Sequence, residues 1–466
     1  MIRSLLLSLS LLVAVPAMAQ TFPSTPPEPG DPIPFTLPEG SSFTLDNGVE
    51  VTLVPYGALP KATIRAVVRV GNVDEGPGQS SLADLTAGLL TEGTTSRTQQ
   101  QIATEAAEMG GSLGAGAGLD QTFVFGEALS EFTPDLVRLV ADVLQNPAFP
   151  ADAFDRIRRN QLRSAAVARS QPGTLARAAF ARALYGDHPY AAVILPDAAQ
   201  IEAASVQDVQ AFYDAQFGPR RTQIYVVGRF DERTVEDTIR RSFGAWSGGA
   251  DVTSPTPPTA QTGRRVILVD QPGAQQSNVT IGLPTIDPSN EDFVALAVTN
   301  ALLGGSFGSR ITRNIREDKG YTYSPGSSVA SRYRSGYWAE SAAIQTPATG
   351  PAITEILYEI DSLATTAPSR AELEGIQNYL AGTFTLQNSS PGGIASFLSF
   401  LDLHGLGRDY LEGYVERVYA VTPDDVRRVT ADYLSPDDLT IVVVGDRAVV
   451  EEQLAPFGDL EVEVLE

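Results

Sequence analysis

The sequence predicts an α+β protein made of two homologous domains, each a mainly antiparallel sheet packed with helices. Its 466 residues are more than one hydrophobic core usually organises. A proline-rich segment, residues 247–263, divides the chain near its middle and is typical of a linker. Residues 205–228 and 422–445 match without a gap: a hydroxyl N-cap, a helix, a proline-marked turn and an apolar strand ending at glycine. A duplicated domain explains this repeat.

The order of the predicted elements favours α+β over a doubly wound sheet. Residues 43–56 alternate around Asn47 and Gly48, which is a hairpin signal, and the next strand begins at Lys61. Thr133 opens one helix and Asp152 begins a longer one. After the linker, the strands VILVD and NVTIGL precede the apolar helix DFVALAVTNALL.

The N-terminus reads as a secretory signal peptide, residues 1–19, with a positive start, an apolar run and an A-x-A cleavage site that ends at Ala19. A proline-rich leader, residues 20–40, follows it. The two domains are then expected at residues 41–246 and 264–466. The chain has no cysteine, so it forms no disulfide, and an exported chain of this kind fits a bacterial periplasm. No later apolar stretch is long enough for a membrane helix.

The charge of the chain excludes some partners. Its net charge of −23 at pH 7 repels nucleic acid and anionic lipid, because binding to either needs a basic patch. The hydrophobic content of 43% indicates a packed protein rather than a disordered one.

Residues 80–98, SSLADLTAGLLTEGTTSRT, together with the hairpin start and the ALYGDHPYA stretch, resemble the insulinase/pitrilysin-type zinc metallopeptidases. The resemblance implies duplicated domains that form one half of a clamshell. Active members carry H-x-x-E-H on this helix, where two His bind zinc and the Glu activates a water molecule. Here Asp84 and Gly88 stand at the His positions and Ala87 at the Glu position. The motif is degenerate, and the chain resembles the non-catalytic subunits of bacterial two-chain members.

The other possible zinc ligands are missing too. Active relatives supply a third ligand, a Glu on a later helix, but residues 156–186 contain no Asp or Glu. The two histidines, His188 and His404, are interpreted as structural, with a relocated zinc site as the alternative. We therefore expect neither a catalytic residue nor a metal in this chain, and zinc in its partner. Gly88 costs a helix about 1 kcal/mol relative to alanine, and it either makes room for a neighbour or reflects drift.

The second half retains another signature of the family. Residues 302–328, LLGGSFGSRITRNIREDKGYTYSPGSS, resemble its C-terminal segment. The resemblance implies that Arg316 and Tyr323 reach the partner's zinc cleft and contact the substrate. The structural alternative is that Arg316 pairs with Glu317 or Asp318 and that Tyr323 packs at the start of a strand.

A glycine-rich approach to an alternating strand, residues 111–129, matches the strand to which relatives add an extended peptide. Here it is either a peptide-binding edge or an edge covered by a loop.

Two functions are compatible with these features of the sequence. The first is a non-catalytic subunit of a periplasmic zinc peptidase, inactive alone, that forms a heterodimer with an H-x-x-E-H-bearing homologue and supplies Arg316 and Tyr323 for peptide hydrolysis. The second is a stand-alone peptide-binding or scaffold protein. Hydrolysis at an unrelated site is disfavoured, because there is no cysteine and neither histidine has a recognisable nucleophile beside it.

Overall fold

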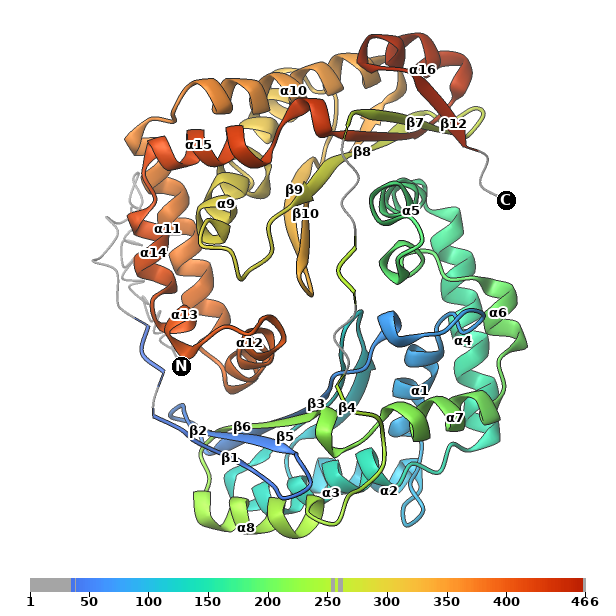
Figure 1. Cartoon of the computed structure of the whole chain (residues 1–466), viewed down its shortest axis with the longest axis vertical. Helices are drawn as coiled ribbons and strands as arrows, with labels where there is room; N and C mark the ends of the chain where they lie inside the picture. The colour runs from blue at the N-terminus through green and yellow to red at the C-terminus, as the bar shows by residue number, and fades with distance from the viewer. Residues whose placement is uncertain (1–34, 38, 253–255, 259–262, 464–466) are drawn as a thin grey trace, which may run out of the picture. The chain divides into compact units, whose positions relative to one another are not determined.

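The computed structural model describes residues 35–37, 39–252, 256–258 and 263–463, which all belong to the unit Pro34–Glu466 (Figure 1). The predicted signal peptide, residues 1–19, lies outside the described residues. So do most of the predicted leader and residues 253–255 and 259–262 of the predicted linker.

The first half of the chain builds a six-stranded sheet in the order β1-β2-β6-β3-β5-β4. Neighbouring strands are antiparallel except for the parallel pair β2 and β6. Asn47 fixes the first hairpin by donating to the carbonyls of Phe243 and Trp246 at 2.8 and 2.9 Å, and Gly48 adopts a φ of 98° there. The strands are β1 Ser41–Thr44, β2 Glu50–Pro55, β3 Lys61–Val68, β4 Ser112–Ala117, β5 Thr122–Leu129 and β6 Thr222–Gly228.

Helices cover one face of this sheet and bury a core that includes Leu53 and Ile64 of the strands and Leu136 of α3. Ser205 and Asp208 form the capping box that begins α7, as the repeat predicts. The helices of this half are α1 Leu82–Leu90, α2 Gln99–Glu108, α3 Thr133–Gln145, α4 Ala151–Ser170, α5 Pro172–Tyr185, α6 Ala198–Ala203, α7 Val206–Gln216 and α8 Glu232–Phe243.

The second half repeats this topology in the order β12-β7-β11-β8-β10-β9. The parallel pair β7 and β11 corresponds to β2 and β6. The outermost strand differs, because β12 comes from the end of the chain and runs parallel to β7. The strands are β7 Arg265–Asp270, β8 Gln276–Thr285, β9 Gly326–Arg332, β10 Ser335–Gln345, β11 Thr440–Gly445 and β12 Leu460–Glu463.

The helices of the second half pack on its sheet around Trp338, which is fully buried. Thr422 and Asp425 repeat the capping box of the first half at the start of α15. Two segments, Ala301–Gly305 and Thr312–Asp318, are π-helical. The α-helices are α9 Phe293–Asn300, α10 Thr349–Thr365, α11 Arg370–Gln387, α12 Pro391–His404, α13 Arg408–Glu412, α14 Tyr414–Ala420, α15 Pro423–Tyr433 and α16 Arg447–Leu454.

The two halves exchange one helix each across their sheets (Figure 1). Helix α5 of the first half packs on β8 and β11, and α12 of the second half packs on β3 and β6. The ring of Phe180 lies over Gly282, where a Cβ atom would come within 2.8 Å of the ring. Tyr225 donates a hydrogen bond to Asp402 of α12. Each sheet is therefore buried on its second face by a helix from the other half.

These features confirm the predicted fold class of an α+β protein with two similar sheet-and-helix domains. The strands of the first sheet lie between residues 41 and 228, and those of the second between residues 265 and 463. None of the helices in the described part of the chain has the length and apolar character needed to cross a membrane.

Candidate functional site

Helix α1 carries the degenerate motif and is held at its N-terminus by Glu75. The carboxylate of Glu75 accepts hydrogen bonds from the backbone N–H groups of Ser81 at 3.1 Å and Ala83 at 2.9 Å. Ser81 itself has a φ of 64°, in the left-handed region that few non-glycine residues adopt. Since the first N–H groups of a helix have no partner within the helix, this distant Glu takes the place of a capping side chain.

Asp84 and Glu75 meet at the amide group of Asn72. The Nδ2 atom of Asn72 donates to Asp84 at 2.9 Å and to Glu75 at 3.1 Å. Burial raises the pKa of Asp84. Burial, with a smaller contribution from the charge of Asp84, raises the pKa of Glu75 to about 7. Both side chains line an open cavity of about 330 Å³ together with Asp187 and Gln200.

The residues around α1 do not form a zinc site. A Cβ atom at Gly88 would lie 3.3 Å from Cγ2 of Ile157 on α4, so that side chain occupies the space beside the second His position. Ala87 is buried and has no group that accepts a proton. Among residues 35–37, 39–252, 256–258 and 263–463, no group of three or more His, Asp or Glu is placed to hold a metal ion. Zinc in catalytic sites takes three protein ligands, and here only Asp84 remains at a ligand position.

Both histidines serve the structure. Nδ1 of His188 accepts a hydrogen bond from the backbone of Tyr190 at 3.2 Å, and its Nε2 lies 3.0 Å from the carbonyl of Thr256. The ring of His404 lies 4.5 Å from that of Phe400, and burial lowers the pKa of His404 to about 4.

The packing of Gly88 gives a testable expectation. Gly88→His should lower the free energy of unfolding by about 1–3 kcal/mol, because the imidazole overpacks against Ile157. Ile157→Ala in the same chain should recover part of that loss. Chemical denaturation of both single variants and the double variant measures the coupling. If the Gly88→His chain is as stable as the wild type and shows no coupling, Ile157 does not fill the site.

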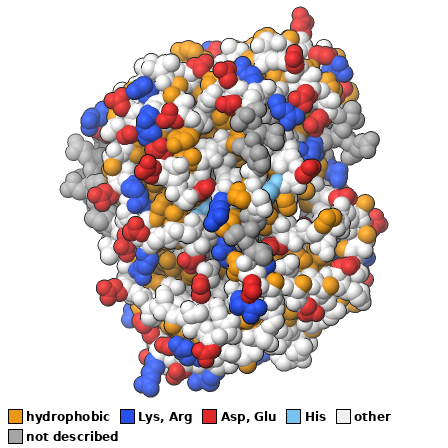
Figure 2. All heavy atoms as spheres, viewed as in Figure 1, with side chains coloured by type: hydrophobic (Ala, Val, Ile, Leu, Met, Phe, Trp, Pro, Cys, Tyr) orange, Lys and Arg blue, Asp and Glu red, His pale blue; other side chains and the backbone are white. Residues whose placement is uncertain are grey.

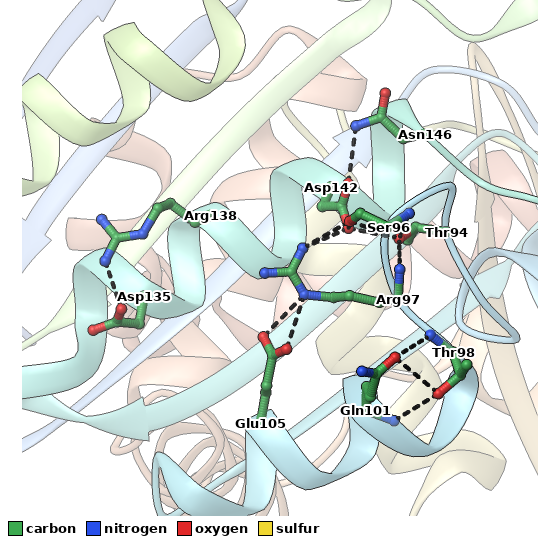
Figure 3. A network of polar contacts seen from close by, with 10 residues as sticks. All are labelled: Thr94, Ser96, Arg97, Thr98, Gln101, Glu105, Asp135, Arg138, Asp142 and Asn146. Atoms are coloured by element: carbon green, nitrogen blue, oxygen red, sulfur yellow. Dashed lines mark hydrogen bonds and ion pairs between the residues drawn. The ribbon is translucent and has the colours of Figure 1, made fainter.

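The loop that follows α1 is fastened to α3 by polar contacts (Figure 3). Asp142 accepts hydrogen bonds from Thr94 at 2.7 Å, Ser96 at 3.0 Å and Arg97 at 2.7 Å. Arg97 also pairs with Glu105 at 3.0 Å. Burial alone would raise the pKa of Asp142, but the hydrogen bonds from Thr94 and Arg97 outweigh it and hold that pKa below its ordinary value. The scaffold around the degenerate motif is therefore intact.

Arg316 and Tyr323 lie close together at the surface. The guanidinium carbon of Arg316 is 5.2 Å from the ring centre of Tyr323 and 4.4 Å from that of Phe307. Gly320, with a φ of 67°, reverses the chain between Arg316 and Tyr323. Tyr323 is 80% exposed and Phe307 is 72% exposed, so neither ring is packed in a core.

This geometry differs from the structural alternative, in which Arg316 pairs with a neighbouring acidic residue and Tyr323 packs at the start of a strand. Within the described ranges Arg316 forms no ion pair with Glu317 or Asp318. We call Phe307, Arg316 and Tyr323 the arginine–tyrosine cluster. It presents a guanidinium fork and a phenol hydroxyl, both of which donate hydrogen bonds to carbonyl or carboxylate oxygens.

The glycine-rich strand β4 is the last strand of the first sheet. Its glycines lie under aromatic rings, because a Cβ atom at Gly114 would come within 2.8 Å of Phe125 and one at Gly116 within 3.1 Å of Phe123. The two rings of β5 thus cover the inner part of β4, as aromatic residues do for glycines in sheets. Peptide addition at this edge stays a prediction.

A buried carboxyl group lies next to the π-helical segment Ala301–Gly305. Glu340 of β10 is 1% exposed, and neither of its oxygens has a hydrogen-bond partner of normal geometry in the described part of the chain. Its Oε2 would lie 2.6 Å from a Cβ atom at Gly304, so the glycine makes room for the carboxyl group. Burial raises the pKa of Glu340 well above its ordinary value, and the nearby amide of Gly326 lowers it only in part.

This burial predicts a pH-dependent stability. The folded chain keeps the proton on Glu340 where the unfolded chain has lost it, so stability falls as the pH rises above the unfolded pKa of about 4.3. Glu340→Gln has no proton to lose. Its stability relative to the wild type should therefore increase from pH 4 to pH 8 in urea titrations. Parallel curves for the two chains would contradict the assignment of a buried neutral carboxyl group.

The chain is similar in sequence to known peptidases and their homologues. The model for "Insulinase (Peptidase family M16)" matches residues 57–197, and the model for "Peptidase M16 inactive domain" matches residues 203–380. An uncharacterized zinc protease of Mycobacterium bovis is 27% identical over 412 residues, which cover 87% of this chain and 93% of the relative. One of Streptomyces coelicolor is 24% identical over 397 residues, which cover 84% of this chain and 86% of the relative.

Two solved structures share the fold. A peptidase M16 inactive domain from Pseudomonas fluorescens has a TM-score of 0.81 at 24% identity, covering 87% of this chain and 98% of that one. A protease from Helicobacter pylori has the same TM-score at 20% identity, covering 88% of this chain and 100% of that one. The fold and the site define a duplicated, peptidase-like protein that lacks the zinc ligands. The chain belongs to peptidase family M16, the insulinase family.

Sequence reasoning missed three residues that shape the degenerate site. Glu75 and Asn72 carried no signal beyond their position before Gly-Pro-Gly, and Ile157 was one apolar residue of a long helix. What connects them to α1 is packing between segments far apart in the chain.

Proposed function

We propose that this chain is the non-catalytic subunit of a periplasmic zinc peptidase. It pairs with a homologue that carries an intact H-x-x-E-H motif and supplies Arg316 and Tyr323 to that homologue's zinc cleft. The observation that carries the proposal is the arginine–tyrosine cluster, which holds two hydrogen-bond donors at the surface of a chain whose own motif has lost its ligands.

The chemistry of the two side chains suits this role. The planar guanidinium group of Arg316 binds a carbonyl or carboxylate oxygen, and the hydroxyl of Tyr323 donates to an oxygen that gains charge during peptide cleavage. Neither group needs a metal of its own. The zinc ion and the general base come from the partner.

The names of the relatives refer both to zinc proteases and to an inactive domain. The mycobacterial and streptomycete relatives are named as zinc proteases, and the Pseudomonas structure is named as an inactive domain. The residues Asp84, Ala87 and Gly88 at the motif positions of the present chain support a non-catalytic role.

Co-expression tests the pairing. The mature chain and an exported homologue with an intact motif, encoded in the same genome, are expressed together and run on a size-exclusion column. We expect one peak at the size of a heterodimer, because the two chains should bury an interface well above about 1,000 Å². Two separate monomer peaks at micromolar concentration would contradict the pairing and favour a stand-alone peptide-binding protein.

A further inference from the structure

Three arginines from the two halves of the chain lie over two neighbouring tyrosine rings, Tyr333 and Tyr337. Tyr333, which is 8% exposed, and Arg334 form the two-residue turn between β9 and β10, and Arg332 precedes them. Arg69 follows β3 of the first half. The guanidinium carbon of Arg69 lies 5.4 Å from the ring centre of Tyr333, and that of Arg334 lies 5.3 Å from it. Arg332 stacks on Tyr337 at 5.5 Å.

Among the residues that the structure describes, no ion pair neutralises the guanidinium groups of these arginines. Within the described residues no carboxylate oxygen lies within 4.0 Å of Arg69, Arg332 or Arg334. The guanidinium group of Arg332 donates a hydrogen bond to the carbonyl of Ser331 at 2.9 Å. Figure 2 shows Lys and Arg side chains on the drawn face with Asp and Glu side chains interspersed among them.

The carboxylates of Asp74, Asp120 and Asp402 attract Arg69 without direct contact, and Asp120 also attracts Arg332, but each of the three carboxylates has another hydrogen-bond partner. Asp120 accepts a hydrogen bond from Tyr190, and Asp402 accepts one from Tyr225. Asp74 pairs with Arg221 at 3.3 Å and accepts from the amide of Gly71 at 2.9 Å. The three arginines therefore form no direct ion pair with a described residue, in a protein whose net charge is −23.

The turn itself points to a role for the side chain of Arg334. Its φ is 51°, which lies in the left-handed region where glycine and asparagine are favoured. A non-glycine residue held there is strained, and such strain is concentrated at functional sites. Arg332 ends β9, the last strand of its sheet, and a last strand is where an added polypeptide can pair.

We propose that Arg69, Arg332 and Arg334 form a binding site for a carboxylate of a polypeptide. An arginine fork binds a carboxylate through two parallel hydrogen bonds, and stacking on tyrosine rings leaves the edge of the fork free to do so. The carboxylate belongs either to an acidic side chain or to a peptide C-terminus. The inference rests on the proposed function only in taking a polypeptide as the ligand.

Four fluorescent peptides of one length test the site by anisotropy with the full mature chain. One carries acidic side chains and an amidated end, one is neutral with a free C-terminus, one is neutral and amidated, and one is basic and amidated. We expect the first or the second to bind more tightly than the third, and the fourth to bind least. The first two peptides distinguish the two sources of the carboxylate. The preference should weaken with added salt.

Variants assign the preference to the three arginines. Arg69→Gln, Arg332→Gln and Arg334→Asn should each weaken binding of the preferred peptide by about tenfold, the loss of a charged hydrogen bond. They should leave the neutral amidated peptide unaffected. Arg233→Gln, at an exposed arginine on α8 without an ion pair among the described residues, is the matched control. Arg334→Asn should keep or raise the melting temperature, because asparagine tolerates the left-handed turn.

Equal binding of all four peptides, or a carboxylate preference that survives the three variants, would overturn the inference. Weaker binding with a parallel loss of melting temperature would also overturn it, since the residues would then be structural. The outcome is separable from the proposed function. A chain that fails to pair with a peptidase but keeps an arginine-dependent preference contradicts only the pairing, and Tyr323→Phe should not alter the preference.

Discussion

Arg316→Ala and Tyr323→Phe are each expected to lower kcat/KM of the reconstituted pair by about 10- to 100-fold, without changing melting temperature or pairing. Loss of one donor to a developing oxyanion typically costs about 10² to 10³ in rate, and the exposure of these residues in the free chain argues for the lower part of that range. Tyr323→Phe keeps the ring beside Arg316 and removes only the hydroxyl. Tyr358→Phe, at another exposed tyrosine, is the matched control and should have no effect.

The double variant shows whether the two groups act on one oxygen. If both hold the same carbonyl, the second substitution should cost less in the variant that already lacks the first donor. A purely structural role predicts another pattern, with activity falling only in proportion to the folded complex. Unchanged activity per folded complex in both single variants would mean that the contact with the substrate does not exist.

Phe180→Ala is expected to lower the free energy of unfolding by about 3–5 kcal/mol. Phe180 is 2% exposed and lies on α5, the helix of the first half that packs on the sheet of the second half. Its ring lies over Gly282 of β8 and 5.5 Å from the ring of Tyr337. The cavity left by the substitution would sit between the two halves.

Because each half buries a helix of the other, both halves should unfold together in one transition that the substitution moves to lower denaturant. Phe307→Ala, which removes a ring that is 72% exposed, should change stability by less than about 0.5 kcal/mol. Tryptophan fluorescence reports on both halves, since Trp246 lies in the first half and Trp338 in the second. Circular dichroism reports on the helices of both halves. Two separate transitions in the Phe180→Ala chain, with only one of them shifted, would contradict the coupling of the halves.

The sequence predicted the repeated parts of the fold because their signals are local. Each capping box, at Ser205 and at Thr422, depends on residues no more than three positions apart. The turn at Gly320 is predicted because glycine readily adopts a positive φ. The loss of the zinc motif was equally visible, since Ala87 and Gly88 have no ligand atoms.

The contacts between distant segments could not be predicted. Nothing in the sequence of α5 says that Phe180 packs on β8 rather than on its own sheet, because an apolar helix face fits either. The same holds for Ile157 beside Gly88. Arg69 and Tyr333 come together only through the packing of the two halves, since each belongs to a different half of the chain. The π-helical segments carry no pattern that separates them from α-helix.

The degenerate site depends on contacts that local sequence rules do not describe. Glu75 occupies a loop position that a capping rule does not address, because it reaches α1 from outside the usual N-cap. Its carboxylate and that of Asp84 both accept hydrogen bonds from Asn72, so the one possible ligand that the motif retained belongs to a half-buried pair of acidic side chains.

Zinc content and peptide hydrolysis, measured together on the chain alone and on the purified pair, test the central claim most directly. The account predicts that the chain alone holds no stoichiometric zinc and cleaves no unfolded peptide. The pair should hold about one zinc per heterodimer and cleave peptide, and that activity should fall when Tyr323 is changed to Phe. About one tightly bound zinc in the chain alone, accompanied by peptidase activity without the homologue, would contradict the account.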